Sequence, residues 1–149
     1  MQSKMKSITN IVVFLAALFL IITLRGKSTA SVSIDKGSMT FSGPGGYHRV
    51  IDYDEIQLDG ITLIDTEDLE ASGQALSGGE NRKYRWGQWD SDTLGEYTAC
   101  VIRKLDTAVL FETTAGETVI FNIESDDTTA SLAASFSELV AYYQDNNIA

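Results

Sequence analysis

Residues 125–143 read SDDTTASLAASFSELVAYY and carry the clearest periodic pattern in the chain. Ser125 is a favourable N-cap, and Asp126 and Asp127 place negative charge at a helix N-terminus, where the helix dipole stabilises it. Apolar side chains then recur every 3.6 residues along one stripe: Leu132, Ala133, Phe136, Leu139, Val140 and Tyr143. The pattern predicts an amphipathic helix over residues 126–144 that packs on a core.

Period-two patterns, typical of strands, precede this helix. We predict strands in residues 31–34, 40–41, 47–53, 95–105, 109–113 and 119–123. Because both faces of residues 95–105 are apolar, that strand should be packed on two sides. The Asp59-Gly60 pair predicts a tight hairpin between the apolar residues that flank it, and the polar residues 65–81 predict a long mobile loop.

Strands followed by one C-terminal helix predict a mainly β fold, either a bent antiparallel sheet or a partly open barrel, capped by the helix. The order of Gly87-Gln88-Trp89, residues 95–101, the strands at 109–113 and 119–122 and the capped helix resembles the bacterial pleckstrin-homology-like (PH-like) domain family. The resemblance covers most of residues 31–145 and includes no catalytic motif. It implies a PH-like β domain over residues 31–145 that acts as a binding scaffold and not as an enzyme.

Residues 8–24 form an apolar run between Lys4 and Lys6 on one side and Arg25 and Lys27 on the other. A helix over this run is about 25 Å long, which lies within the range for crossing a bilayer. The run therefore predicts a transmembrane helix, or signal-anchor, that a linker at residues 25–30 joins to the domain.

Two alternatives remain for the apolar run. A signal peptide also combines a basic start with an apolar centre, and Ser28 and Ala30 suit a processing site that would release a secreted domain. Arg25 and Lys27 favour the uncleaved anchor, because a processing region is usually uncharged. A buried helix of the fold is the second alternative, and the lack of a polar face argues against it.

The bases that flank the run nearly balance, but a short basic N-terminal tail tends to remain in the cytoplasm. The sequence thus predicts a single-pass protein of the cell membrane with an extracytoplasmic domain. The single Cys100 is compatible with either side of the membrane.

The chain carries 21 acidic and 11 basic residues, a formal net charge of −10. Such a surface repels phosphate backbones, which excludes general nucleic-acid binding. Eukaryotic PH relatives bind phosphoinositides with several Lys and Arg residues around the first hairpin. The corresponding loop here offers Lys36, His48 and Arg49 beside Asp35 and Asp52, so we do not expect headgroup binding.

Residues 82–89, RKYRWGQW, interleave basic and aromatic side chains. Since Arg, Tyr and Trp dominate binding hot spots and suit the membrane interface, this segment is a candidate contact with a partner. Its candidate contact residues are Arg82, Tyr84, Arg85, Trp86 and Trp89. In the alternative, the segment is a strand whose aromatic side chains enter the core while its arginines pair with nearby acids.

The usual catalytic constellations are incomplete in this sequence. His48 stands alone, and Cys100 lies in an apolar strand without a base nearby. The acids within residues 52–55 and 65–68 lack the spacing of a metal site, and we interpret them as a solvated face. The sequence predicts no enzyme activity, no cofactor and no metal site.

These features predict a non-catalytic, membrane-tethered PH-like module that binds another protein or a second copy of itself. Three other functions stay open. They are a carrier that holds a small apolar ligand inside the barrel, a secreted domain left after signal-peptide cleavage, and an enzyme that works through its acidic residues.

Overall fold

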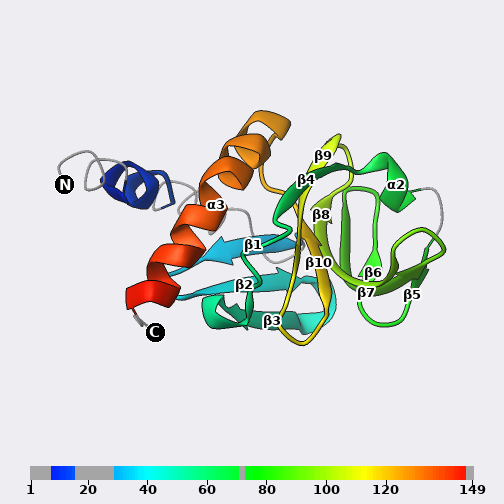
Figure 1. The fold of residues 1–149 in the computed structure, drawn as a ribbon. Helices are drawn as coiled ribbons and strands as arrows, with labels where there is room; N and C mark the ends of the chain where they lie inside the picture. The colour runs from blue at the N-terminus through cyan, green and yellow to red at the C-terminus, as the bar shows by residue number, and fades with distance from the viewer. Residues whose placement is uncertain (1–7, 16–28, 71–72, 147–149) are drawn as a thin grey trace.

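The computed structural model describes residues 8–15, 29–70 and 73–146. These residues form a three-stranded sheet, a seven-stranded sheet and one long C-terminal helix, α3 (Figure 1). The prediction of a mainly β fold with a C-terminal helix is confirmed at this level. Within the described ranges the strands make two open sheets and do not close into a barrel.

The three-stranded sheet is an antiparallel meander of β1 (Ser31–Ile34), β2 (Ser38–Gly43) and β3 (Tyr47–Asp52). The turn between β2 and β3 is a short 3₁₀ segment, Pro44–Gly46. Its Gly45 and Gly46 adopt φ values of 73° and 78°, a conformation that favours glycine. The strands predicted at residues 31–34, 40–41 and 47–53 are therefore confirmed.

The seven-stranded sheet has the order β4-β9-β10-β8-β7-β5, with β6 also paired to β7. Its strands are β4 (Thr62–Asp65), β5 (Gln74–Ala75), β6 (Gly79–Glu80), β7 (Tyr84–Ser91), β8 (Gly95–Ile102), β9 (Thr107–Glu112) and β10 (Thr118–Phe121). β10 forms an antiparallel hairpin with β9 and runs parallel to β8. The expectation of a purely antiparallel sheet is thus wrong at one pair, because β10 inserts between two strands that follow each other in the chain.

Two local predictions are wrong. The turn at Asp59-Gly60 exists, but its flanks do not pair with each other: Ile56 bridges to Thr113, and β4 pairs with β9. The turn therefore interrupts one edge of the large sheet. Residues 65–81 hold a short helix, α2 (Glu67–Glu70), together with β5 and β6, and do not form one long loop.

Apolar side chains pack on both faces of the seven-stranded sheet. The larger core fills the space between the two sheets and under α3, and includes Cys100 of β8. The smaller core lies on the opposite face and includes Tyr97, Ala99 and Val101 of the same strand. The prediction that this strand is packed on two sides is confirmed.

The C-terminal helix α3 (Asp126–Asn146) closes the larger core. Ser125 caps it as predicted, since its Oγ accepts a 3.1 Å hydrogen bond from the Thr128 N–H. The Phe136 ring packs against three other rings at centroid distances of 5.7–6.4 Å, those of Tyr53, Phe111 and Phe121. Burying a side chain of this size contributes roughly 1.5–3 kcal/mol, so α3 belongs to the folded domain.

The predicted membrane helix, residues 8–24, is described only in part. Residues 8–15 are helical, and Ile11 and Leu15 pack against the larger core. Val12, Val13 and Phe14 are exposed, at 46%, 62% and 36%. Within the described ranges, no helix has both the length and the apolar composition for crossing a bilayer; residues 16–24 of the run, and residues 25–28 of the linker, lie outside these ranges.

Candidate functional site

The candidate contact segment, residues 82–89, lies mostly on β7, which pairs along its whole length with β8. Arg82 precedes the strand and is exposed. The other four candidates, Tyr84, Arg85, Trp86 and Trp89, are only 4–8% exposed. Alternation along the strand sends Tyr84 and Trp86 into the larger core and Trp89 into the smaller one.

Arg85 is the most heavily bonded of these side chains. Its guanidinium donates two hydrogen bonds to Glu80 Oε2, from Nε at 3.2 Å and from Nη2 at 3.0 Å. Its Nη1 donates to the carbonyl oxygen of Leu69 in α2 and, at 3.1 Å, to the Tyr97 hydroxyl. The cation lies 4.1 Å from the ring centroid of Trp89. Arg85 therefore joins α2, β6 and β8 to β7.

Trp86 owes its position to close backbone packing around it. The indole lies over Gly43 of β2, where a Cβ atom would come within 2.9 Å of the ring. On the other side of β7, Gly87 with φ of 93° meets Ser77 and Gly78, and a Cβ at Gly87 would lie 2.3 Å from the Ser77 carbonyl oxygen. Glycine at these places lets β7 lie close to both neighbours.

This arrangement corresponds to the core-packing alternative for residues 82–89. The buried side chains hold the two cores together, and Arg85 pairs with an acid as that alternative expects. Of the five candidates, Arg82 presents its side chain to solvent. Contact between this segment and a partner stays a prediction.

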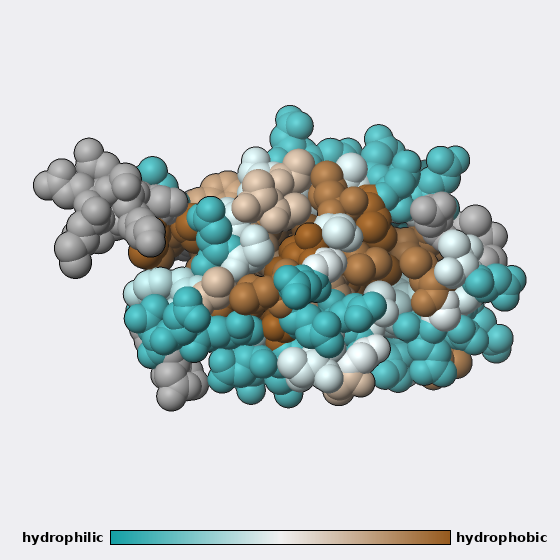
Figure 2. Space-filling view, in the orientation of Figure 1, coloured by the Kyte–Doolittle hydropathy of each residue, from teal (hydrophilic) through white to brown (hydrophobic). Residues whose placement is uncertain are grey.

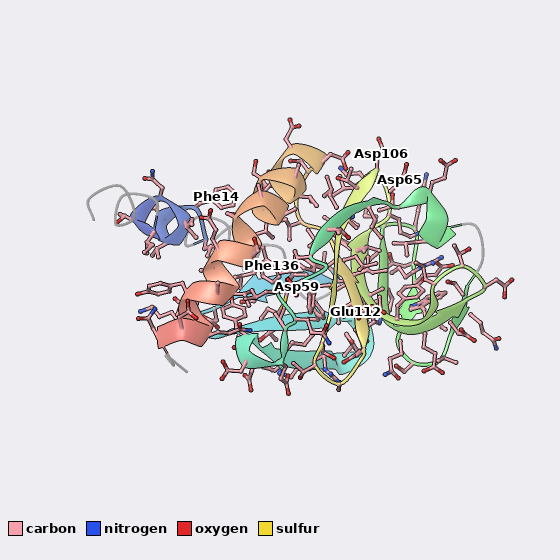
Figure 3. The ribbon with its side chains drawn as sticks, in the orientation of Figure 1. Phe14, Asp59, Asp65, Asp106, Glu112 and Phe136 are labelled. Carbon is pink, nitrogen blue, oxygen red and sulfur yellow. The ribbon has the colours of Figure 1, made fainter. Side chains whose placement is uncertain are left out.

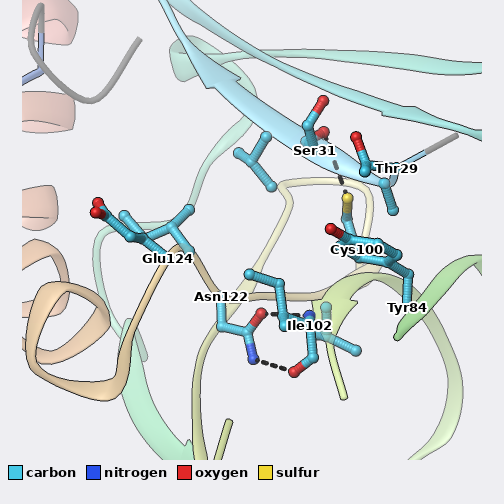
Figure 4. Close-up of a pocket in the computed structure, with 11 residues that line it drawn as sticks. Thr29, Ser31, Tyr84, Cys100, Ile102, Asn122 and Glu124 are labelled. Atoms are coloured by element: carbon cyan, nitrogen blue, oxygen red, sulfur yellow. Dashed lines mark hydrogen bonds between the residues drawn. The ribbon is translucent and has the colours of Figure 1, made fainter. Parts of the chain in front are cut away.

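Asn122, a buried asparagine that was not among the predicted site residues, joins two other strands of the sheet where β10 ends. Its Oδ1 accepts a hydrogen bond from the Ile102 N–H at 2.6 Å, and its Nδ2 donates to the carbonyl oxygens of Ile102 and Thr107 at 3.1 and 3.2 Å. Asn122 thus bridges β8 and β9, and Figure 4 shows its two bonds to Ile102 of β8. A polar residue directly after an apolar strand, Val119 to Phe121, was the available signal.

A small apolar pocket lies beside this bridge, between the start of β1 and the ends of β8 and β10 (Figure 4). Its volume is about 30 Å³, room for a water molecule rather than for a drug-sized ligand. Cys100 lines it, with Sγ 3.4 Å from the Ser31 carbonyl oxygen. Burial raises the pKa of this thiol to about 12, so it is protonated and a poor nucleophile at neutral pH.

A more open hollow of about 310 Å³ lies between β3, β7, β8 and the turn before β10. Arg49 and Glu117 pair across it at 2.6 Å, and the Thr98 hydroxyl donates to the other oxygen of Glu117 at 2.5 Å. The Arg49 charge is therefore already engaged inside the molecule. Of the three bases near the first hairpin, Lys36 and His48 remain exposed.

The acidic residues of the described ranges do not form a metal-binding group: no three or more His, Cys, Asp or Glu side chains there are placed to hold an ion. Several of them serve the backbone instead. Glu55 accepts from the Asp52 N–H at 3.3 Å, and Asp65 accepts from the Glu67 N–H at 2.9 Å. Asp126 accepts from the Thr107 hydroxyl and from two backbone N–H groups, which holds the pKa of that carboxyl below its usual value.

The described residues also expose an apolar strip at one end of the large sheet, made of Leu63 on β4 and Leu58 before the turn that leads into it. Leu58 and Leu63 are 39% and 44% exposed, and Figure 2 shows apolar surface over this part of the molecule. A strand edge with exposed apolar side chains is a typical docking surface.

No protein-family model, curated protein or solved structure matches the chain.

Proposed function

We propose that the protein is a non-catalytic, membrane-tethered binding module of the PH-like kind, in which the apolar run at residues 8–24 holds the domain of residues 31–145 beside a bilayer. The mainly β architecture closed by α3 is compatible with this domain type. The PH-like assignment itself rests on the sequence resemblance.

The observation that carries the tether is the exposed apolar surface of residues 8–15. Ile11 and Leu15 contact the domain, while Val12, Val13 and Phe14 turn outward. Apolar side chains exposed to water cost free energy that burial in a bilayer recovers, at about 25 cal/mol per Å². A helix that packs on the domain with one side and contacts lipid with the other explains both the apolar side chains that are buried and those that are exposed.

The binding role is supported by the apolar strip at the end of the large sheet, where Leu63 of β4 and Leu58 before it stay exposed. A carrier of small apolar ligands would need a large apolar cavity. The apolar pocket beside Cys100 has a volume of only about 30 Å³, and aromatic rings fill the space under α3.

The tether is tested by alkaline extraction of membranes from cells that make the full chain. We expect the protein to stay in the membrane pellet. Changing Leu18→Asp and Ile22→Asp together should move it to the supernatant, because each acid within a membrane helix costs roughly 2.5–3.5 kcal/mol.

The matched control changes Leu58→Asp and Leu63→Asp, which makes the same apolar-to-acid replacement on exposed domain positions. This variant should remain in the pellet. Wild-type protein in the supernatant would overturn the tether and favour a secreted domain.

A further inference from the structure

β4 forms an open edge of the seven-stranded sheet. In the described ranges it pairs with β9 only, in the register Thr62↔Leu110 to Asp65↔Thr107. The Thr66 N–H donates to the Asp106 carbonyl oxygen at 2.9 Å, two residues beyond Ile64↔Ala108. Since inward and outward backbone groups alternate along an antiparallel pair, the N–H and C=O groups of Leu63 and Asp65 point away from β9.

This edge carries two exposed apolar side chains, Leu63 at its centre and Leu58 near its Glu112 end. Leu63 is 44% exposed, and Leu58, before the turn, is 39% exposed. Ile61 and Ile64 are half-buried: Ile61 packs against the larger core and Ile64 against the smaller one. Edge strands usually carry charged or kinked residues that prevent pairing, and the middle of β4 has neither.

Acidic side chains stand at both ends of the edge. Asp65 and Asp106 lie near its α2 end, and Asp59 and Glu112 lie near the opposite end (Figure 3). All four are exposed. Among the basic residues, Lys104, two residues before Asp106, is the closest in sequence to any of these four acids. The edge is thus apolar in the middle and negative at each end.

We propose that this edge accepts an extended segment of another protein as an added strand, a segment that is apolar at its centre and carries Lys or Arg at both ends. The added backbone bonds to the outward groups of Leu63 and Asp65, and its apolar centre covers Leu63. Its bases meet the four acids. This inference rests on the proposed function of a binding module and specifies its partner.

A second copy of the chain fits the edge less well. In an antiparallel pair of two β4 strands, the Asp65 and Asp106 end of one copy meets the Asp59 and Glu112 end of the other. Like charges placed opposite each other destabilise strand pairs, and each copy carries a net charge of −10. A basic partner reverses the sign of this interaction.

The edge of β3 provides an internal comparison. Val50 is 45% exposed, and the Tyr53 N–H donates to the Gly37 carbonyl oxygen, so the backbone groups of Val50 also point away from its sheet partner. The side chains beside Val50 on this strand are Arg49 and Ile51, one a base held by Glu117 and the other buried. β3 therefore has an open backbone, but Val50 has no exposed apolar neighbour on the strand, and the strand has an acid, Asp52, at one end and a base, Arg49, on the other side of Val50.

The test is an NMR titration of the full chain in detergent micelles with the peptide Lys-Lys-Val-Ile-Val-Lys-Lys. We expect amide shifts in residues 58–66 and 106–113 that weaken as salt is added. A peptide with glutamates in place of its lysines, and a lysine peptide N-methylated at alternate residues, should each bind at least tenfold more weakly. The first loses the charge complement, and the second loses the backbone donors.

The matched variants are Leu63→Pro and Val50→Pro. Each removes an outward N–H from an exposed position without removing a ladder hydrogen bond. Leu63→Pro should abolish the shifts while leaving the rest of the spectrum folded, and Leu63→Lys should weaken binding without a backbone change. Val50→Pro should bind like the wild type.

Other outcomes would overturn the inference. Shifts that persist in Leu63→Pro mean that the peptide binds elsewhere, and equal binding by the N-methylated peptide means charge attraction without strand addition. Dimerisation without peptide that Leu63→Pro abolishes assigns the edge to a second copy. None of these results removes the tether, which the membrane extraction tests separately.

Discussion

Arg85 shows how a single side chain can hold distant segments together. It is 4% exposed and bonds to the carbonyl oxygen of Leu69, the Tyr97 hydroxyl and Glu80. A guanidinium offers five N–H donors in a fixed planar fork, whereas a lysine ammonium offers three around one point, which cannot reproduce the spread of the Arg85 contacts. Arg85 should therefore be intolerant of lysine.

We expect Arg85→Lys to lower the free energy of unfolding by about 2–4 kcal/mol, because it leaves buried acceptors without donors. The matched change Arg82→Lys, at an exposed position three residues earlier, should stay within about 0.5 kcal/mol of the wild type. Denaturant titrations followed by tryptophan fluorescence measure both. Equal effects would contradict the central role of Arg85.

The residue scale is also where prediction from sequence was weakest. The alternation of residues 82–89 was visible, and the core-packing alternative for Trp86 and Trp89 followed from it. The partners of Arg85 were not predictable, since the Leu69 carbonyl oxygen reaches it only after α2 has folded back onto β7. The same holds for Asn122, whose acceptors and donors lie on two other strands.

At the scale of elements, local patterns were predicted well and pairings poorly. The periodic sequence of α3 specified its start, its cap and its buried stripe, because these depend on neighbours within a turn or two. The insertion of β10 between β8 and β9, and the pairing of β4 with β9, depend on contacts between distant segments. The period-two pattern of a strand does not contain that information.

Asp126 couples α3 to the start of β9, and this contact should be sensitive to acid. Its pKa is lowered in the folded state, so the stabilisation is complete above the unfolded-state pKa, which is about 3.9. It is lost as the pH falls through the folded-state pKa. The stability difference between wild type and Asp126→Asn should therefore shrink as the pH is lowered below about 4.

Asp127 provides the control for this comparison. It is the next residue of the same helical turn, and its side chain is exposed. Asp127→Asn should change stability less than Asp126→Asn at neutral pH. If thermal melts show the same pH dependence for both variants, the contact between Asp126 and Thr107 does not matter for stability.

At the scale of the whole molecule, the side of the membrane that holds the domain can be determined with cysteine chemistry. Cys100 is 2% exposed and its pKa is raised to about 12, so it should not react with a maleimide in the folded protein. Leu76, between β5 and β6, is 53% exposed and is a suitable labelling position.

For the variant Leu76→Cys, we expect an impermeant maleimide to label intact cells, with wild-type protein as the unlabelled control. Labelling that requires permeabilised cells would place the domain in the cytoplasm. That result would reverse the orientation and leave the tether itself in place.

The tether determines where the β4 edge meets its partners, and the intact mass of the membrane-bound chain tests it most directly. We expect protein recovered from alkaline-washed membranes to retain its N-terminal run, at about the 16.3 kDa of the whole sequence. A soluble product that begins at Ser31, cut after Ala30, would contradict membrane tethering.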